Sequence, residues 1–390
     1  MCLRIVHVIT RLIVGGAQEN TLLTCEGLAS RGNEVTLLSG PTTGPEGSLV
    51  GRARQGSYQY EELPDLVRAV NPWREFKAQR AVQSRIEWIH RAIVHTQSSK
   101  AGMLGRLAAH RAGVPIIVHT IHGMSFNRTQ SAATRILYAM LERHCAGKTH
   151  KLVSVADAMT RQSLASRIGK ADQYVTIRSG MVVADFDPAR VVGHAIRGQW
   201  GMPSDAVIVG TVARLFENKG YEQLIEIIDL AVKREPRLRF VWIGDGARRE
   251  RYAAELQRRG LGQYVKTIGL IPPDQMPQVL AGVDLLAHTS QWEGLPRAVV
   301  QALLMEKPAI SFDIDGAPEV IEPGVTGSLA DLGDLRGFAD ALVELAKDAD
   351  LRTRFGQAGR LRCLKEFDHR AMVDRLEQLY QEITVQHRDS

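Results

Sequence analysis

The stretch that decides the fold is residues 206–235, which read AVIVGTVARLFENKGYEQLIEIIDLAVKRE. Its first part is a continuous Val- and Ile-rich run, typical of a parallel strand buried on both faces. Its second part repeats apolar residues at helical spacing. A strand that ends near Val212, a polar loop, and a helix after Gly220 together make one unit of a parallel α/β sheet.

The same alternation continues on both sides of this stretch. We expect helices at 17–32, 100–113, 247–261 and 296–307, and strands at 4–10, 34–39, 92–96, 116–123, 152–156, 174–180, 239–246, 265–271, 284–290 and 308–313. Strands that alternate with helices in both halves predict an α/β fold of two Rossmann-like domains with parallel sheets.

The domain boundaries follow from length and composition. A chain of 390 residues suits two domains better than one, and residues 184–205 are polar and interrupted by Pro and Gly. We expect an N-terminal domain over 1–188 and a C-terminal domain over 189–368. Residues 369–390 form an amphipathic helix, expected to pack back toward the N-terminal domain.

Charge is distributed unevenly. Residues 1–190 hold 24 Lys and Arg against 14 Asp and Glu, which indicates an anionic substrate or surface, or simply a solvated basic face. Residues 72–94 are either an ordinary surface helix or a basic helix that lies on an anionic membrane. Their bases and aromatics are Arg74, Lys77, Arg80, Arg85, Arg91, Trp73, Phe76 and Trp88.

Other features narrow the class of protein. The four cysteines lack the spacing of a zinc or redox site. No run of 18 apolar residues occurs, residues 1–10 suit a first strand better than a signal peptide, and no nucleic-acid-binding module is recognisable. We expect a cytoplasmic protein, either free or peripheral at the inner face of the cell membrane, that binds no nucleic acid.

Arg214 and Lys219 are the first candidate site residues. Both lie on the loop after the strand at 206–212, and ligands of open α/β sheets bind at the carboxyl ends of the strands. Two cations just before a helix suit a diphosphate. Taken alone, they can equally be surface charges.

Glu293 and Gly294 form a second candidate, in the turn between a strand and a helix that starts near Pro296. The helix N-terminus points partial positive charge at a ligand, and Glu293 can accept hydrogen bonds from sugar hydroxyls. Gln301 lies about two turns further along nearly the same face. The alternative is a carboxylate that only stabilises the helix dipole.

Gly15 and Gly16 open a helix after the first strand, and His122 ends another strand. The glycines permit close approach of a phosphate to backbone N–H groups, and His122 can donate to a sugar oxygen. The alternatives are that the glycines form a plain structural turn and that His122 is an ordinary polar residue. The patterns GxGxxG and GxxxxGK[ST] are absent. His7, His95, His119 and His288 are less well placed.

Metal ligation is not expected. The sequence contains no HExxH motif, no cluster of His and Cys at ligand spacing, and no DxD pair that is expected to bind a metal. Asp313 and Asp315 are interpreted as loop residues. We expect no cofactor.

Together these stretches resemble retaining glycosyltransferase family 4, a GT-B family of the bacterial surface-polysaccharide type. The resemblance covers nearly the whole chain and is strongest over residues 207–333. Its blocks are GTVARLFENKG, VWIGDG, IGLIPPDQMP, SQWEGLPRAVVQAL and GAPEVIEPGVTG, with GGAQ, HTQSSKAGMLGRLAAHRAGVP and HTIHG in the N-terminal half. It implies that the two sheets face a central cleft.

The resemblance also assigns roles. Arg214 and Lys219 correspond to the pair that holds the donor diphosphate, and Glu293 to the Glu that contacts the transferred sugar. Gly16 corresponds to the loop that closes on the phosphates, with Gly15 beside it, and His122 to a His near the donor sugar. The remaining donor-binding positions are Gly294 and Leu295 for backbone N–H groups, and Gly269, Leu270 and Ile271 for the base.

One position departs from the family. Gln301 stands where the family has a second Glu that accepts from the ribose hydroxyls, so a neutral acceptor replaces a charged one. The implied reaction is metal-independent transfer of a hexose-type sugar, with retention, to a glycan or lipid-linked acceptor. UDP is favoured over GDP. The alternatives are a donor-binding pseudoenzyme or scaffold, and a GT-B sugar-nucleotide epimerase.

Overall fold

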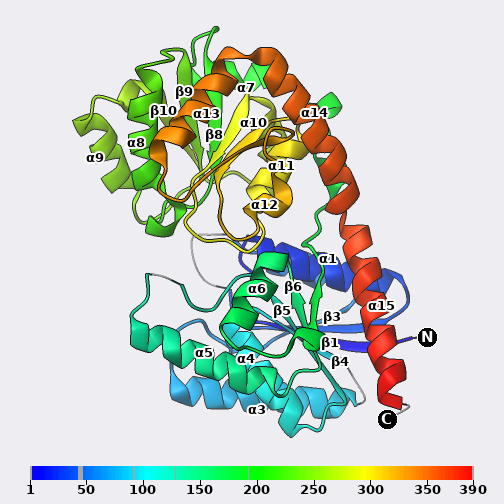
Figure 1. Ribbon diagram of the computed structural model, residues 1–390. Coiled ribbons are helices and arrows are strands. Elements are labelled where there is room, and N and C mark those ends of the chain that lie inside the picture. The colour runs from blue at the N-terminus through cyan, green and yellow to red at the C-terminus, as the bar shows by residue number, and fades with distance from the viewer. Residues whose placement is uncertain (1, 43–46, 91–92, 128, 192, 389–390) are drawn as a thin grey trace. The chain divides into compact units, whose positions relative to one another are not determined.

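The computed structural model describes residues 2–42, 47–90, 93–127, 129–191 and 193–388 (Figure 1). It divides into two compact units. Unit 1 comprises residues 1–181 and 368–390, and unit 2 comprises residues 182–367. Arg91 and Ala92, which belong to stretches considered above, lie outside the described residues.

Unit 1 is built on a parallel sheet with the strand order β3-β2-β1-β4-β5-β6-β7. The central strands are almost wholly buried, as expected for apolar runs covered on both faces. The strands are β1 (Arg4–Ile9), β2 (Glu34–Ser39), β3 (Gln59–Glu62), β4 (Ile93–Gln97), β5 (Ile116–Ile121), β6 (Lys151–Ser154) and β7 (Tyr174–Thr176).

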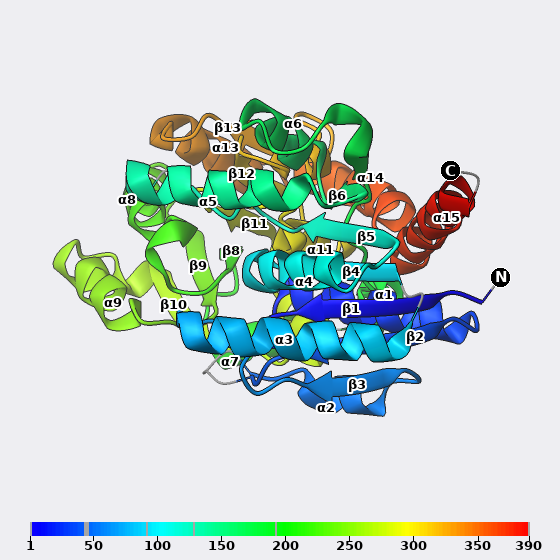
Figure 2. The same ribbon diagram turned by 90° about the horizontal axis from the view of Figure 1, so that it is seen from below.

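Helices cover both faces of this sheet. On one face α3, α4 and α5 lie side by side, as the view from below shows (Figure 2). On the other face α1 packs against the C-terminal helix α15. The helices of unit 1 are α1 (Gly16–Ser30), α2 (Val50–Gln55), α3 (Pro72–Ile89), α4 (Ser99–Arg111), α5 (Ala132–Ala146), α6 (Asp157–Ala165) and α15 (His369–Arg388).

Helix α15 is fastened to unit 1 by specific contacts. Arg31 donates to Glu377 at 2.9 Å, and the Asn33 side chain donates to the same carboxylate at 2.7 Å. The apolar stripe of the helix is buried, and the Tyr380 hydroxyl reaches the buried ring of His95. The last helix therefore completes the core of unit 1.

Unit 2 repeats the architecture with the parallel order β10-β9-β8-β11-β12-β13. Its strands are β8 (Val207–Val212), β9 (Leu238–Ile243), β10 (Val265–Gly269), β11 (Leu285–His288), β12 (Ala309–Phe312) and β13 (Gly327–Ala330). Its helices are α7 (Gly193–Trp200), α8 (Tyr221–Val232), α9 (Arg249–Arg258), α10 (Met276–Ala281), α11 (Arg297–Leu304), α12 (Ala317–Val320), α13 (Leu335–Lys347) and α14 (Ala349–Glu366).

The stretch at 206–235 forms the centre of unit 2. Strand β8 is buried between β9 and β11, and α8 packs its apolar side into the same core. Tyr221 stacks on Tyr252 with a centroid distance of 5.2 Å, and Trp242 meets Tyr221 edge-on at 4.8 Å. This aromatic cluster fixes the start of α8, and with it the loop that carries Lys219.

Several elements were not anticipated from the sequence. Strands β3 and β13 read QYEE and GSLA, which lack the Val- and Ile-rich runs used to recognise buried strands, because both lie at sheet edges. Helix α7 forms within the polar stretch at 184–205. Arg197 ties it to unit 2 by donating to Asp284 at 2.7 Å.

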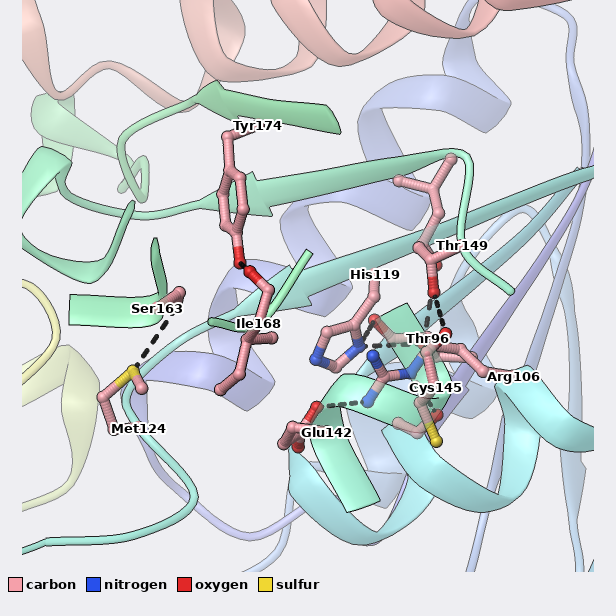
Figure 3. A network of polar contacts seen from close by, with 12 residues as sticks. Thr96, Arg106, His119, Met124, Glu142, Cys145, Thr149, Ser163, Ile168 and Tyr174 are labelled. Atoms are coloured by element: carbon pink, nitrogen blue, oxygen red, sulfur yellow. Dashed lines mark hydrogen bonds and ion pairs between the residues drawn. The ribbon is translucent and has the colours of Figure 1, made fainter. Parts of the chain in front are cut away.

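A buried ion pair joins α4 to α5 (Figure 3). The Arg106 side chain is fully buried and donates to the Glu142 carboxylate at 2.6 Å and to the Gly102 carbonyl at 2.8 Å. Behind it, His119 and Thr96 bond to each other at 2.9 Å. A charge taken out of water requires such a partner, so this pair fixes which side of α5 faces inward.

Candidate active site

The loop after β8 holds Lys219 against the end of the neighbouring strand β11. The Thr289 hydroxyl donates to the Lys219 carbonyl at 3.1 Å, and the Gln291 N–H donates to the Asn218 carbonyl at 3.1 Å. Gly220 has a φ of +71°, and a Cβ there would lie 1.8 Å from the Thr289 carbonyl oxygen. Only glycine fits this position, so the backbone itself places Lys219.

Lys219 and Glu293 meet at this point. The Lys219 Nζ lies 2.5 Å from Glu293 Oε1, and both side chains are less than one-fifth exposed. The two residues come from the loops after β8 and β11, which are adjacent strands. Strand order changes direction here, and open α/β sheets bind ligands at such switch points.

The charge on Glu293 is held by its neighbours. Burial alone would raise its pKa, but the Lys219 ammonium and His288 together outweigh burial and lower it, so the pKa lies far below the usual range. The stabilisation from this ionised carboxylate is present above its unfolded pKa and is lost only as pH falls through the folded value. At neutral pH Glu293 accepts hydrogen bonds and does not act as an acid.

Two residues were missed by the sequence analysis. His288 was judged less well placed, but its Nε2 lies 3.5 Å from Glu293 Oε1. Asp315 was interpreted as a plain loop residue, but its carboxylate accepts from the Glu293 N–H at 2.6 Å. Asp315 has a φ of +46°, a rare conformation for a residue other than glycine. No local pattern in the sequence indicates either contact.

The residues that follow Glu293 form a turn that leads into α11. The Gly294 carbonyl accepts from the Gly316 N–H at 3.1 Å, and Leu295 is buried. Pro296 directly precedes α11, and no side chain caps that helix. Gln301 follows on α11 and is half-buried. The structure therefore groups Lys219, Glu293, Gly294 and Leu295, with Gln301 on the helix that follows.

Arg214 lies on the same loop as Lys219 but differs in its surroundings. Its side chain is exposed, and its guanidinium lies 5.0 Å above the Phe216 ring. An exposed cation stacked on one aromatic face can still turn toward an anion.

The loop expected to bind the base, Gly269 to Ile271, begins at the last residue of β10. The Gly269 carbonyl accepts from the Gly244 N–H at 2.8 Å, which joins the loops after β9 and β10. Gly269 has a φ of +80°, and the Leu270 side chain is exposed. The loop thus presents backbone and one apolar side chain at the same carboxyl edge of the sheet.

The remaining candidates belong to unit 1. Gly16 is the first residue of α1, Gly15 precedes it, and no side chain caps this helix. Its first-turn N–H groups therefore suit an anion. His122 directly follows β5, and its Nε2 lies 2.7 Å from Gln97 Oε1 at the end of β4. Both positions lie at the carboxyl edge, near the switch point between β1 and β4.

Among the described residues, no group of three or more His, Cys, Asp and Glu side chains is arranged to hold a metal ion. Two Rossmann-like units, each with candidate residues at the carboxyl ends of its strands, define a protein of the GT-B fold class.

Two family models match this chain. The model described as glycosyl transferases group 1 matches residues 194–362, and the model described as a glycosyl transferase 4-like domain matches residues 15–180. Together they span most of both units. The chain belongs to the glycosyltransferases of family 4, and it is a glycosyltransferase.

Individual relatives agree with this assignment. A UDP-Gal:alpha-D-GlcNAc-diphosphoundecaprenol alpha-1,3-galactosyltransferase from Escherichia coli is 26% identical over 389 residues, 98% of each chain. The crystal structure of Anabaena HepE with UDP-glucose has a TM-score of 0.81 at 20% identity, covering 97% of this chain and all of that one. WaaG, a glycosyltransferase involved in lipopolysaccharide biosynthesis, has a TM-score of 0.75 at 15% identity, covering 96% and 99%.

Proposed function

We propose that this glycosyltransferase transfers a hexose-type sugar from a UDP-sugar to a lipid-linked glycan acceptor in surface-polysaccharide assembly. The full-length similarity to a transferase whose name specifies a UDP-sugar and a diphosphoundecaprenol acceptor supports this. The fold shared with a protein crystallised with UDP-glucose supports the same donor.

The observation that carries the proposal is the Lys219–Glu293 pair. An ammonium has three N–H donors, so Lys219 can keep its bond to Glu293 while it contacts a diphosphate oxygen. Arg214, on the same loop, supplies a second cation. Positive charge placed in advance at the leaving diphosphate stabilises the transition state. In this proposal the two side chains take the place of a divalent metal.

Retention at the anomeric carbon is part of the proposal. Glu293 is engaged by Lys219, His288 and the turn closed by Asp315, which suits an acceptor of sugar hydroxyl hydrogen bonds and not a nucleophile. The departing diphosphate and the incoming hydroxyl would then share one face of the sugar. The bond from the sugar to the diphosphate would break, and the bond to the acceptor hydroxyl would form, while the positively charged sugar and the diphosphate remain an ion pair.

The identity of the nucleotide is tested by calorimetric titration of UDP and GDP. We expect UDP to bind more tightly, and we expect Gln301→Glu to tighten UDP binding because a carboxylate accepts ribose hydroxyls more strongly. A gain of about 1 kcal/mol corresponds to about fivefold.

Gln257→Glu, which adds the same charge at an exposed position of α9, serves as the control. Tighter binding of GDP than UDP would refute the base preference. Unchanged or weaker UDP binding by Gln301→Glu would refute the role of that residue.

The proposed contact with an anionic membrane rests on α3 and α5, which flank α4 on one face of unit 1. Helix α5 exposes an apolar stripe of Ile136, Leu137, Met140 and Leu141, each 39–59% exposed. The Arg106–Glu142 pair holds the opposite side of α5 inward, so the stripe must face outward. Large exposed apolar patches mark interaction surfaces.

Helix α3 contributes aromatic and basic groups to this face. Trp73 and Phe76 are exposed and stacked with a centroid distance of 6.0 Å, and Lys77 and Arg80 lie over their rings. Aromatic side chains mixed with bases suit the headgroup region of an anionic bilayer. In the described part of the chain, no helix is long and apolar enough to cross a membrane.

Vesicle sedimentation tests this surface. Wild-type protein is expected to sediment with phosphatidylglycerol vesicles, and the double variant Leu137→Ser/Met140→Ser to lose about tenfold or more in partitioning, because two apolar side chains no longer enter the bilayer. Leu361→Ser, at a still more exposed leucine of unit 2, should change nothing. Equal partitioning of the double variant and the wild type would exclude α5 as the contact.

A further inference from the structure

Gln97, the last residue of β4, lies between two histidines. Its Oε1 is 2.7 Å from His122 Nε2, and its Nε2 is 3.4 Å from His7 Nδ1 on β1. Gln97 is almost fully buried and His7 completely so. One amide group thus joins β1, β4 and the residue that follows β5, three strands that are adjacent in the sheet.

The chemistry of the amide determines where the hydrogens lie. An amide oxygen only accepts and an amide nitrogen only donates. In this arrangement His122 Nε2 must therefore carry a hydrogen, and His7 Nδ1 must be a bare acceptor. Burial lowers the pKa of His7 to about 3, so the ring is neutral at physiological pH and can accept. Neutral His122 then accepts a sugar hydroxyl through Nδ1, and donates there only when protonated.

The His7 ring is itself held in place. It packs against His95 with a centroid distance of 5.0 Å. His95 bonds to Thr120 at 2.7 Å and to the Tyr380 hydroxyl of α15. Since all these groups are buried, neither imidazole can turn without breaking contacts in the core. The ring that faces the Gln97 amide is thereby held in place by the core of unit 1.

We propose that Gln97 is a positioning residue for glycosyl transfer: its amide oxygen fixes the ring orientation and the tautomer of His122. This inference rests on the proposed role of His122 beside the donor sugar. In metal sites, removing a group that orients a ligating histidine typically changes activity by about 10- to 100-fold. We expect a loss of that size here, because the wrong tautomer presents a donor where an acceptor is needed.

The experiment combines kinetics with ¹⁵N NMR of the histidine rings. Gln97→Met, which keeps the shape and removes both polar atoms, should lower kcat about 10- to 100-fold with little change in KM for the donor. The ring signals of His122 should change from the Nε2–H form to a mixture of tautomers. Gln79→Met, at a buried glutamine of α3, is the matched control and should change neither.

Two further variants separate positioning from general damage. Gln97→Glu still accepts from His122, and His7 can move its hydrogen to Nδ1 at no loss, since its Nε2 has no partner among the described residues. It should therefore keep the Nε2–H form of His122 and retain more activity than Gln97→Met. In a His122→Ala background, Gln97→Met should cause no further loss.

The outcomes distinguish this inference from the function on which it rests. An unchanged His122 tautomer in Gln97→Met, or an equal loss of kcat in the His122→Ala background, overturns the positioning role. If His122→Ala is fully active, the proposed role of His122 fails, and the NMR signals still decide whether Gln97 fixes its tautomer.

Discussion

Lys219→Ala is expected to lower kcat/KM for glycosyl transfer by about a hundredfold to a thousandfold, the usual consequence of removing one preorganised group that stabilises developing negative charge. The variant loses the ammonium that lies 2.5 Å from Glu293, while the backbone contacts of the loop to Thr289 and Gln291 remain. Initial rates with a UDP-hexose donor measure the effect.

Stability and catalysis must be separated in this variant, because Glu293 is left as a largely buried carboxylate without its ammonium. Lys219→Ala/Glu293→Gln removes both charges and should recover stability without recovering activity. Lys233→Ala, at an exposed lysine of α8's C-terminal end, should behave as wild type. Near-normal activity of a folded Lys219→Ala protein would rule out the assigned role.

Arg106→Met is expected to destabilise unit 1 by about 3–5 kcal/mol, because it leaves the buried Glu142 carboxylate without its partner. Hydrogen exchange of the amides in α4 and α5 measures this in unit 1 alone. The Arg106→Met substitution should also loosen α5, and with it the apolar stripe proposed to contact the membrane.

The matched comparison is Arg52→Met. Arg52 also pairs with a glutamate, Glu26, at 2.6 Å, but this pair is 30–40% exposed, so its loss should cost under about 1 kcal/mol. Arg106→Met/Glu142→Leu should regain most of the lost stability, since replacing both members of a buried pair is often neutral. Equal effects of Arg106→Met and Arg52→Met would contradict the importance of burial.

The architecture was predictable from the sequence because buried parallel strands consist of continuous runs of apolar residues. Strand β8 and helix α8 were expected from such a run and from helical spacing, and the α/β class with two Rossmann-like units is confirmed. The edge strands β3 and β13 were not predicted, because a strand of polar or small residues has no comparable pattern.

The site was predictable only in part. Lys219 and Glu293 could be proposed because each follows a strand, and parallel strands end at one edge. Asp315 could not, because its contact to Glu293 depends on how the loops after β11 and β12 fold together. His288 could not, because its contact depends on how the chain turns back after β11. The Gln97 bridge to His122 likewise joins residues from different strands. The roles assigned to the site residues remain predictions.

The most direct test of the proposed function is the product formed from a UDP-hexose and a polyprenyl-diphosphate-linked sugar in the presence of EDTA. We expect the same initial rate with and without the chelator, because Lys219 and Arg214 are proposed to neutralise the departing diphosphate. NMR of the product should show the anomeric configuration of the donor. A rate that depends on added Mg²⁺, or a product with inverted configuration, would contradict the proposal.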